Sequence, residues 1–296
     1  MEVELSNAVL ELEVPEVVCE TKSETSLSEE EVLAPSGDYL IVSECFDSIQ
    51  GEGASVGIPM LFLRMTGCNL TCFGWGIGGC DTTEVWKTGK RRSFEEILAY
   101  WEENAWLDEL VGNGRKRICF TGGEPFLQQQ RLIDFLRYLR TKLAANQKGA
   151  RIEVEWETNC TIVPTSFKEI SNADSNLGIF QFYNCCPKLK SAGNTKETIN
   201  PEAMAIFANL SWLQHAHGMH STFKFVIQNA KEDMEELLDL QRAFNINPAG
   251  IYLMPQGASV EELAESYPVV AELCKKHHFK FSPRLHVNIW NQATGV

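Results

Sequence analysis

Three cysteines that lie close together are the first residues whose type and spacing could do chemistry. Cys68 and Cys72 are separated by three residues, and Cys80 follows after seven more. Three thiolates without a fourth ligand nearby are typical of an iron–sulfur cluster that leaves one iron open to a small molecule. We therefore expect these cysteines to bind a 4Fe–4S cluster. The alternatives are a structural zinc ion, which needs a fourth ligand, or buried thiols without a metal.

Short polar motifs elsewhere in the chain come directly after segments that are expected to be β-strands. They occupy residues 121–125, 157–160, 186–188, 254–257 and 284–286. In a parallel α/β barrel the carboxyl ends of the strands share one face, and such folds do their chemistry at that face. We therefore expect these motifs and the cysteine loop to form a single pocket.

The elements that must position these motifs follow from the hydrophobic periodicity. Strands are expected at 39–46, 60–66, 116–121, 151–157, 178–183, 222–228, 250–254 and 279–282. Helices are expected at 93–104, 126–145, 231–244 and 259–277, the first of them opened by a capping box from Ser93 to Glu96. This alternation of strands and helices indicates parallel βαβ units in an α/β fold.

Charge divides the chain into two parts. Residues 1–37 hold ten Glu and one Lys, which is −9 of the net charge of −14. This segment is expected to be a mobile acidic extension, and residues 38–296 the catalytic domain. So acidic a chain argues against binding to a nucleic-acid backbone. The basic run at 87–92 is expected to be a solvated loop.

Hydropathy and the remaining cysteines bear on the compartment. No apolar run is long enough to span a membrane, and the first residues do not form a secretory signal, so we expect a cytoplasmic protein. Cys45, Cys119 and Cys274 lie in apolar segments and are expected to be packing residues. Cys160, Cys185 and Cys186 are interpreted as substitutions, with an auxiliary metal as the alternative, and Cys19 lies in the acidic extension.

Several motifs resemble those of the radical S-adenosylmethionine (SAM) superfamily and, more narrowly, the 7-carboxy-7-deazaguanine synthase family. The Gly-Gly-Glu-Pro run at 122–125 is common to the superfamily. The more specific matches are FDSIQGEG at 46–53, the strand GIPMLFLR at 57–64, CDT at 80–82 and RLH at 284–286; ETN at 157–159, KFV at 224–226 and MPQG at 254–257 add to them. The resemblance runs from about residue 39 to the end. It implies a partial TIM-like (β/α) barrel with a mainly parallel sheet.

The resemblance also implies a reaction. Members of this family are lyases of deazapurine and queuosine biosynthesis that convert 6-carboxy-5,6,7,8-tetrahydropterin into 7-carboxy-7-deazaguanine, with a radical ring contraction and loss of ammonia. It implies a 4Fe–4S cluster, SAM and Mg²⁺ as cofactors, and flavodoxin or ferredoxin as electron donor. It further implies a homodimer, with no nucleic-acid or membrane partner.

Individual roles follow from the same resemblance. Thr82 is the expected magnesium ligand. The expected SAM contacts are Gly79, Asp81, Gly122, Gly123, Glu124, Cys186, Pro187, Lys188, Met254, Pro255, Gln256 and Gly257. The expected substrate contacts are Ile49, Gln50, Gly51, Glu52, Arg64, Thr121, His286 and the carboxylate of Val296.

Chemistry supports three of the substrate assignments. Gln50 and Glu52 can hydrogen-bond a pterin edge, because an amide and a carboxylate complement its donors and acceptors. The guanidinium of Arg64 can pair with the substrate carboxylate through two parallel hydrogen bonds. A structural ion pair is the alternative for Arg64, since a strand interior rarely holds an unpaired guanidinium.

The chain departs from the superfamily in the cysteine loop, where seven residues instead of two separate the last two cysteines. Four of the seven are glycines, which let the loop fold back tightly. An aromatic residue usually precedes the third cysteine, where this chain has Gly79, so Trp75 or Ile77 is expected to fill that space. Two other functions remain open at this point: another radical SAM reaction, such as activation of a glycyl-radical enzyme, and a non-catalytic zinc or iron–sulfur module.

Overall fold

A nine-stranded sheet forms the centre of the computed structural model, which describes residues 37–75, 79–80, 87–110, 116–144, 150–165, 177–213, 218–291 and 293. The strands are β1 (Tyr39–Ile49), β2 (Pro59–Met65), β3 (Lys90–Ser93), β4 (Arg117–Gly122), β5 (Ala150–Thr158), β6 (Leu177–Cys185), β7 (Met219–Ile227), β8 (Ile251–Pro255) and β9 (Lys280–Phe281). The helices are α3 (Phe94–Glu103), α4 (Leu107–Leu110), α5 (Gln129–Ala144), α7 (Pro201–Ser211), α8 (Ala230–Phe244), α9 (Val260–His277) and α10 (Leu285–Trp290). Every expected strand and helix is present, with ends shifted by a few residues.

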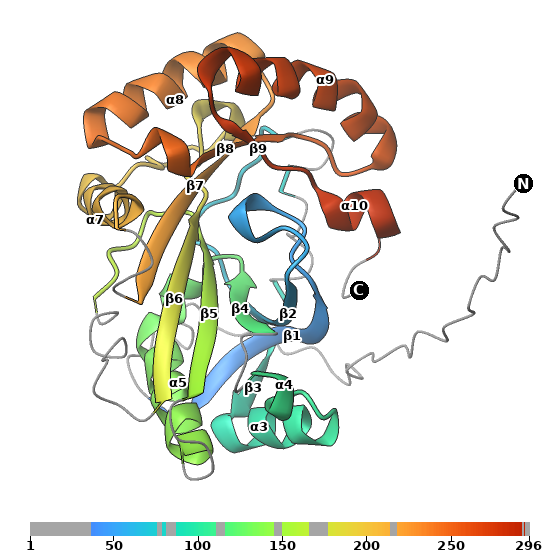
Figure 1. Cartoon of the computed structure of the whole chain (residues 1–296), viewed down its shortest axis with the longest axis vertical. Coiled ribbons are helices and arrows are strands. Elements are labelled where there is room, and N and C mark those ends of the chain that lie inside the picture. The colour runs from blue at the N-terminus through green and yellow to red at the C-terminus, as the bar shows by residue number, and fades with distance from the viewer. Residues whose placement is uncertain are drawn as a thin grey trace, which may run out of the picture.

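The order of the strands confirms the expected partial barrel. The sheet runs β3-β1-β2-β4-β5-β6-β7-β8-β9, and every neighbouring pair from β2 to β9 is parallel. Only β1 breaks the pattern, because it pairs antiparallel with both β2 and β3. The sheet is open, with β3 and β9 at its two edges. Figure 1 shows its strands with α7 on one side and α10 on the other.

The two faces of the sheet have different surroundings, which β5 illustrates. Ile152, Val154 and Trp156 alternate along the strand and belong to the main hydrophobic core, which the helices cover. The glutamates between them, Glu153 and Glu155, therefore point to the opposite face, inside the barrel, where both are buried. A strand of alternating apolar and charged residues usually has one face in water. Here the charged face lines the interior of the protein instead.

Local signals explain where the helices begin. Ser93 and Glu96 form the expected capping box, since Glu96 N donates to Ser93 Oγ at 3.1 Å and Ser93 N donates to Glu96 Oε2 at 2.6 Å. Helix α7 was not expected from periodicity, because it is apolar on most sides. Its start is nonetheless marked by Asn200, whose side chain caps Glu202 N, and by Pro201 in the first turn.

One expectation about the fold is wrong. The basic run at 87–92 is not a loop throughout, because Lys90–Ser93 forms strand β3 at the edge of the sheet. Lysine and arginine are common on edge strands, where their charge discourages pairing with another chain. The Arg91 guanidinium also lies 4.2 Å from the centre of the Tyr39 ring. Within the described ranges, no helix combines the length and the apolar character needed to cross a bilayer.

Candidate active site

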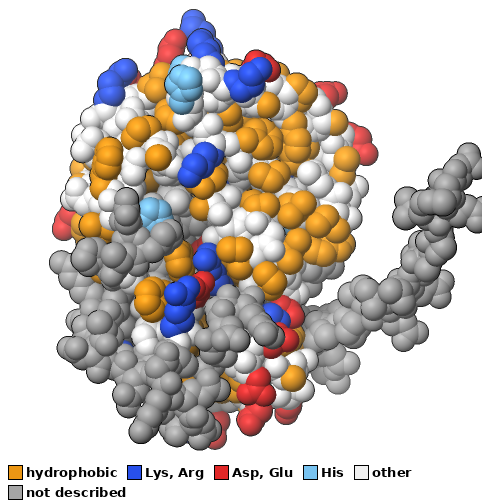
Figure 2. Space-filling view, viewed as in Figure 1, with side chains coloured by type: hydrophobic (Ala, Val, Ile, Leu, Met, Phe, Trp, Pro, Cys, Tyr) orange, Lys and Arg blue, Asp and Glu red, His pale blue; other side chains and the backbone are white. Residues whose placement is uncertain are grey.

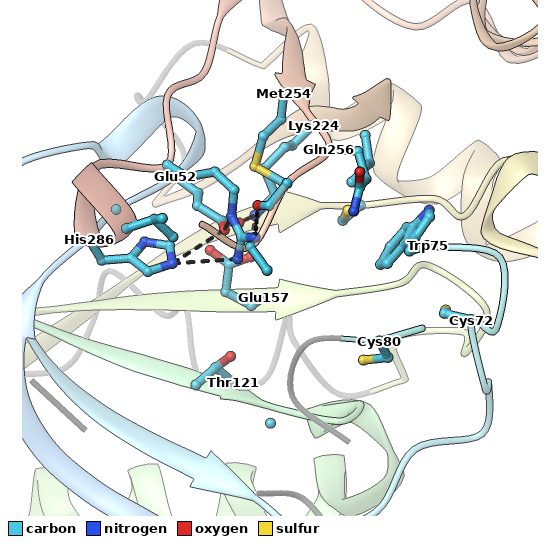
Figure 3. A pocket seen from close by; sticks show the side chains of 18 of the residues that line it. Glu52, Cys72, Trp75, Cys80, Thr121, Glu157, Lys224, Met254, Gln256 and His286 are labelled. Carbon is cyan, nitrogen blue, oxygen red and sulfur yellow. Dashed lines mark hydrogen bonds and ion pairs between the residues drawn. The ribbon is translucent and has the colours of Figure 1, made fainter. Parts of the chain in front are cut away.

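A cavity of about 490 Å³ opens at the carboxyl ends of the parallel strands. Its walls include residues from the cysteine loop after β2, from the ends of β4, β5, β6 and β8, and from the segment around α10. Figure 3 shows Cys72 and Cys80 on one side of this cavity and a charged group with Glu52, Lys224 and His286 on the other. The strand-end motifs and the cysteine loop therefore do meet in one pocket.

Most of the residues expected to bind cofactor or substrate line this cavity. They are Ile49, Gln50, Gly51, Glu52, Arg64, Cys68, Cys72, Gly79, Cys80, Thr121, Gly122, Gly123, Cys186, Lys188, Met254, Pro255, Gln256, Gly257 and His286. Glu124 and Pro187 are described but do not line it. Asp81, Thr82, Ile77 and Val296 lie outside the described residues, as does the acidic extension up to residue 36.

The three expected cluster ligands border the cavity together, and their chemistry suits an iron–sulfur cluster. Burial raises the pKa of Cys68 to about 12 and also raises the pKa of Cys72, so both thiols stay protonated until a cation stabilises their thiolates. Among the described residues, no three His, Cys, Asp or Glu side chains are grouped closely enough to hold a single metal ion. The set of three soft sulfur donors beside an open cavity fits a cluster with one accessible iron.

The glycines after β4 pack directly against the cysteine loop. A Cβ atom on Gly123 would lie 2.1 Å from the carbonyl oxygen of Gly67 and 2.6 Å from Cys68 Cβ. A Cβ atom on Gly122, whose φ is +132°, would lie 2.2 Å from the carbonyl oxygen of Met65. Only glycine fits at both positions, so the backbone of the turn after β4 lies directly against the cysteine loop.

Glu124 has a supporting role behind the cavity wall. Its side chain is fully buried and accepts hydrogen bonds from Phe126 N at 3.0 Å, Thr158 Oγ1 at 2.9 Å and Asn159 N at 2.7 Å. Burial raises the pKa of Glu124 to about 7 in spite of these hydrogen bonds. The carboxylate ties the turn after β4 to the end of β5.

A buried ionic group forms the opposite wall. Lys224 Nζ on β7 lies 2.6 Å from Glu52 Oε2 and 3.1 Å from Glu157 Oε2. Arg284 Nε lies 2.9 Å from Glu52 Oε1, and His286 Nε2 lies 3.9 Å from the same oxygen. Burial alone would raise the pKa of Glu52, but the charges of Lys224 and Arg284 hold it well below its usual range. Glu52 is therefore a fixed anion at the edge of the cavity.

Gln50 connects this group to the carboxylates inside the barrel. Its side-chain nitrogen Nε2 donates to Glu155 Oε1 at 2.7 Å and to Glu157 Oε1 at 2.9 Å, and its Oε1 accepts from Glu52 N at 3.1 Å. Asn184 Nδ2 also donates to Glu157 Oε1, at 2.7 Å. The amide of Gln50 is thus engaged with protein groups, although the residue borders the cavity.

Arg64 stands on β2 beside Thr121 on β4, because the two residues are paired in the parallel register. Its Nε lies 2.8 Å from Glu44 Oε2, but the geometry is not that of a hydrogen bond, so the contact is an ion pair. Phe46 packs its ring 5.5 Å from the guanidinium carbon. Arg64 thus has the ion-pair partner of the alternative interpretation and also lines the cavity, and its contact with a substrate carboxylate stays a prediction.

Trp75 fills space between the cysteine loop and the strand ends. It packs against Cys186 and Met254, and the Lys188 ammonium lies 4.8 Å from its ring centre. Its indole Nε1 is buried and has no hydrogen-bond partner in the described part of the chain. A bound ligand with an acceptor atom would satisfy this donor.

Five of the other described cysteines are packed in the protein, whereas Cys186 lines the cavity. Cys119, Cys160, Cys185 and Cys274 are buried, and Cys45 accepts a hydrogen bond from Trp101 Nε1 at 3.1 Å. Burial raises the pKa of Cys160 and of Cys185. Cys160 and Cys185 are therefore neutral packing groups.

Sequence reasoning gave no site role to several polar residues, among them Glu157, Lys224 and Arg284, although it singled out the motifs that contain these three. Glu155 and Asn184 are on the inner face of the sheet, and Asn194 hydrogen-bonds the cysteine loop from a segment 122 residues away. Apolar and charged residues alternate along β5, and this pattern includes Glu155. The same pattern is typical of a strand with one face in water, so it did not indicate a buried carboxylate. Nothing near Asn194 in the sequence indicates its contact.

Known proteins resemble this chain in sequence and in fold. A family model described as a 4Fe–4S single cluster domain matches residues 49–156. The 7-carboxy-7-deazaguanine synthase of Pyrobaculum aerophilum is 31% identical, over 86% of this chain and 96% of the relative. That of Halobacterium salinarum is 31% identical, over 87% of this chain and 93% of the relative. The crystal structure of QueE from Escherichia coli has the same fold, with a TM-score of 0.55 and 18% identity over 88% of this chain and 100% of that one.

Proposed function

The chain belongs to the 7-carboxy-7-deazaguanine synthase family, and from this premise we propose that its cavity carries out the ring contraction of 6-carboxy-5,6,7,8-tetrahydropterin. The protein is a radical SAM lyase that uses a 4Fe–4S cluster and SAM. The proposal rests on one observation: the three thiols, the glycine turn after β4 and the ionic group around Glu52 all line the same cavity.

The decisive experiment is anaerobic incubation of the reconstituted protein with SAM, a reductant, Mg²⁺ and the carboxy-tetrahydropterin. We expect 7-carboxy-7-deazaguanine to form, detected by its mass, together with released ammonia. Cleavage of SAM without this product would point to another radical SAM reaction.

Cys68, Cys72 and Cys80 would hold the cluster, which supplies the electron for reductive cleavage of SAM. The backbone of Gly122 and Gly123 borders the same region and would receive the methionine part of SAM. The indole of Trp75, with its unpartnered N–H, would contact the adenine in place of the usual aromatic residue before the third cysteine. These groups orient SAM and exclude water from it.

The substrate would lie between Arg64 and the ionic group. Arg64 carries a positive charge for the substrate carboxylate, and its neighbour Thr121 offers a hydroxyl on the same face. The anionic Glu52 and the ring of His286 would accept hydrogen bonds from the donor-rich edge of the pterin. Gln50 would act on the substrate indirectly, by holding Glu157 and Glu155 in place.

Three expected contacts lie outside the described residues: Asp81, Thr82 and the carboxylate of Val296, which would bind the substrate. Thr82 would bind Mg²⁺ through its hydroxyl, since Mg²⁺ usually keeps several waters and needs few protein oxygens. Asp81 would lie beside SAM. Depletion of Mg²⁺ with a chelator tests the metal, and should lower product formation without removing iron.

We further propose a homodimer in the cytoplasm that is reduced by flavodoxin or ferredoxin. Cys68, Cys72 and Cys80 need a reducing compartment to remain available for a cluster. Figure 2 shows hydrophobic side chains gathered over α9 and α10, where Val260, Val269 and Ile289 are exposed. Sedimentation of the purified protein tests the dimer, and reduction by each donor tests the electron source.

A further inference from the structure

Residues 190–194 form a clamp on the cysteine loop. Gly74 N donates to the carbonyl oxygen of Ala192 at 2.9 Å. A Cβ atom on Gly74 would lie 2.3 Å from the carbonyl oxygen of Ser191, and one on Gly193 would lie 2.6 Å from Gly74 N. The two backbones are thus in direct contact, so the position of one segment fixes that of the other.

Asn194 ends this clamp and binds the loop through its side chain. Its Oδ1 accepts hydrogen bonds from Thr71 N at 2.9 Å and from Cys72 N at 2.8 Å. The chain needs this support, because Cys72 has a positive φ of 49°, which is unfavourable for a residue with a side chain.

The same two hydrogen bonds fix the orientation of the amide. An amide oxygen accepts hydrogen bonds and an amide nitrogen donates them, so Oδ1 must face the two backbone N–H groups. The nitrogen Nδ2 of Asn194 is therefore turned to the thiol of Cys72, and it lies 3.4 Å from Cys72 Sγ. Asn194 is the source of an N–H···S hydrogen bond to a proposed cluster ligand.

We infer that Asn194 is a positioning residue that sets the reduction potential of the cluster through its hydrogen bond to Cys72. The inference rests on the proposed binding of the cluster by Cys68, Cys72 and Cys80. Hydrogen bonds to the sulfurs are one of the factors that set the potential of an iron–sulfur cluster. An N–H group aimed at sulfur draws off negative charge. It therefore stabilises the reduced cluster, which carries one more electron, and raises the potential.

Two variants separate the hydrogen bond to sulfur from the clamp on the loop. Asn194→Asp keeps an oxygen acceptor for Thr71 N and Cys72 N but has no N–H for the sulfur. Asn194→Ala removes both functions without adding charge. Asn209→Asp makes the same chemical change at an exposed position of α7 and serves as the control.

The measurement is an anaerobic redox titration of the reconstituted protein, followed by the electron paramagnetic resonance of the reduced cluster. We expect both Asn194 variants to be about tenfold harder to reduce, which is about 59 mV more negative for one electron. Asn194→Asp should keep most of its iron, whereas Asn194→Ala should lose part of it. The control should match the wild type in both.

Two results would overturn the inference. The first is a wild-type potential in the Asn194→Asp variant, measured on the fraction that carries a cluster. If neither variant holds a cluster, the wild-type protein is labelled with ¹⁵N in its asparagine side chains and its reduced cluster is studied by electron paramagnetic resonance. Absence of a magnetic coupling between ¹⁵N and the cluster would reject the hydrogen bond. Failure of the wild type to bind a cluster would instead refute the assignment of the three cysteines.

Discussion

Cys68, Cys72 and Cys80 lie in one loop at an open cavity, and among the other described cysteines only Cys186 also lines that cavity. Cys160 and Cys185 are also buried, but they lie in the main hydrophobic core. This difference could be anticipated from the sequence, because the first three share one loop of a recognisable spacing. What the sequence could not supply is the set of groups that hold the loop, such as Asn194, because they come from distant segments.

Replacement of single cysteines tests this distinction. Alanine at Cys68, Cys72 or Cys80 should remove most of the bound iron and abolish SAM cleavage, because a cluster with two protein ligands is poorly held. Alanine at Cys160 or Cys185 should leave the iron content nearly unchanged. Iron and SAM cleavage are measured after anaerobic reconstitution. Equal loss of iron in all five variants would contradict the choice of ligands.

Arg64 provides a second test at the residue scale. Arg64→Lys keeps the charge but loses the planar guanidinium that can form two parallel hydrogen bonds. The free energy of substrate binding should therefore weaken by about 1.5–3 kcal/mol, the scale of a charged hydrogen bond. Glu44→Gln removes the ion-pair partner and keeps the guanidinium, so its effect should be smaller. Substrate binding is measured by titration, and SAM cleavage without substrate serves as the control. Normal affinity in Arg64→Lys would reject the carboxylate contact.

Strand β5 shows what an element adds to single residues. Its alternation of apolar and charged residues was enough to locate the strand, and its pairing confirms the ends within one residue. The pattern could not show that the charged face is inside. Burial of Glu155 depends on partners from other elements, among them Arg117 on β4 and Gln50 after β1.

The buried carboxylate of Glu155 should make stability depend on pH. Burial and then the charge of Glu157 raise the pKa of Glu155 from 4.5 to about 7. Between these two values the folded protein holds a proton that the unfolded chain has lost, so the free energy of unfolding falls as pH rises. Glu155→Gln should therefore match the wild type near pH 5 and exceed it at pH 8, by at most about 3 kcal/mol.

Chemical denaturation at the two pH values measures this effect. Glu272→Gln, at an exposed position of α9, is the matched control and should change stability by less than about 0.5 kcal/mol at both. A Glu155→Gln variant with the same pH dependence as the wild type would show that another group accounts for it.

At the scale of the whole molecule, the arrangement of the strands was the most predictable property. Most strands of the parallel part contain apolar residues in a run or in alternation, and helices were expected in several of the connections, which favours parallel neighbours. The antiparallel pairing of β1 with β3 was not anticipated, because β3 is short and basic and resembles a loop. Helix α10, which carries His286 beside the cavity, was also missed, since six residues give too little periodicity.

The last prediction concerns the acidic extension. The described cavity-lining residues all lie between Phe46 and Ala293, and the matches to both relatives leave more than a tenth of this chain unmatched. We therefore expect a variant that lacks residues 1–36 to fold, bind iron and form product at rates within about twofold of the full chain. The removed segment carries nine of the fourteen net negative charges, so the variant should also elute from an anion exchanger at a lower salt concentration than the full chain. Iron content, circular dichroism and product formation are compared in the two proteins. Loss of the cluster or of folding in the shortened chain would show that the extension is part of the catalytic domain.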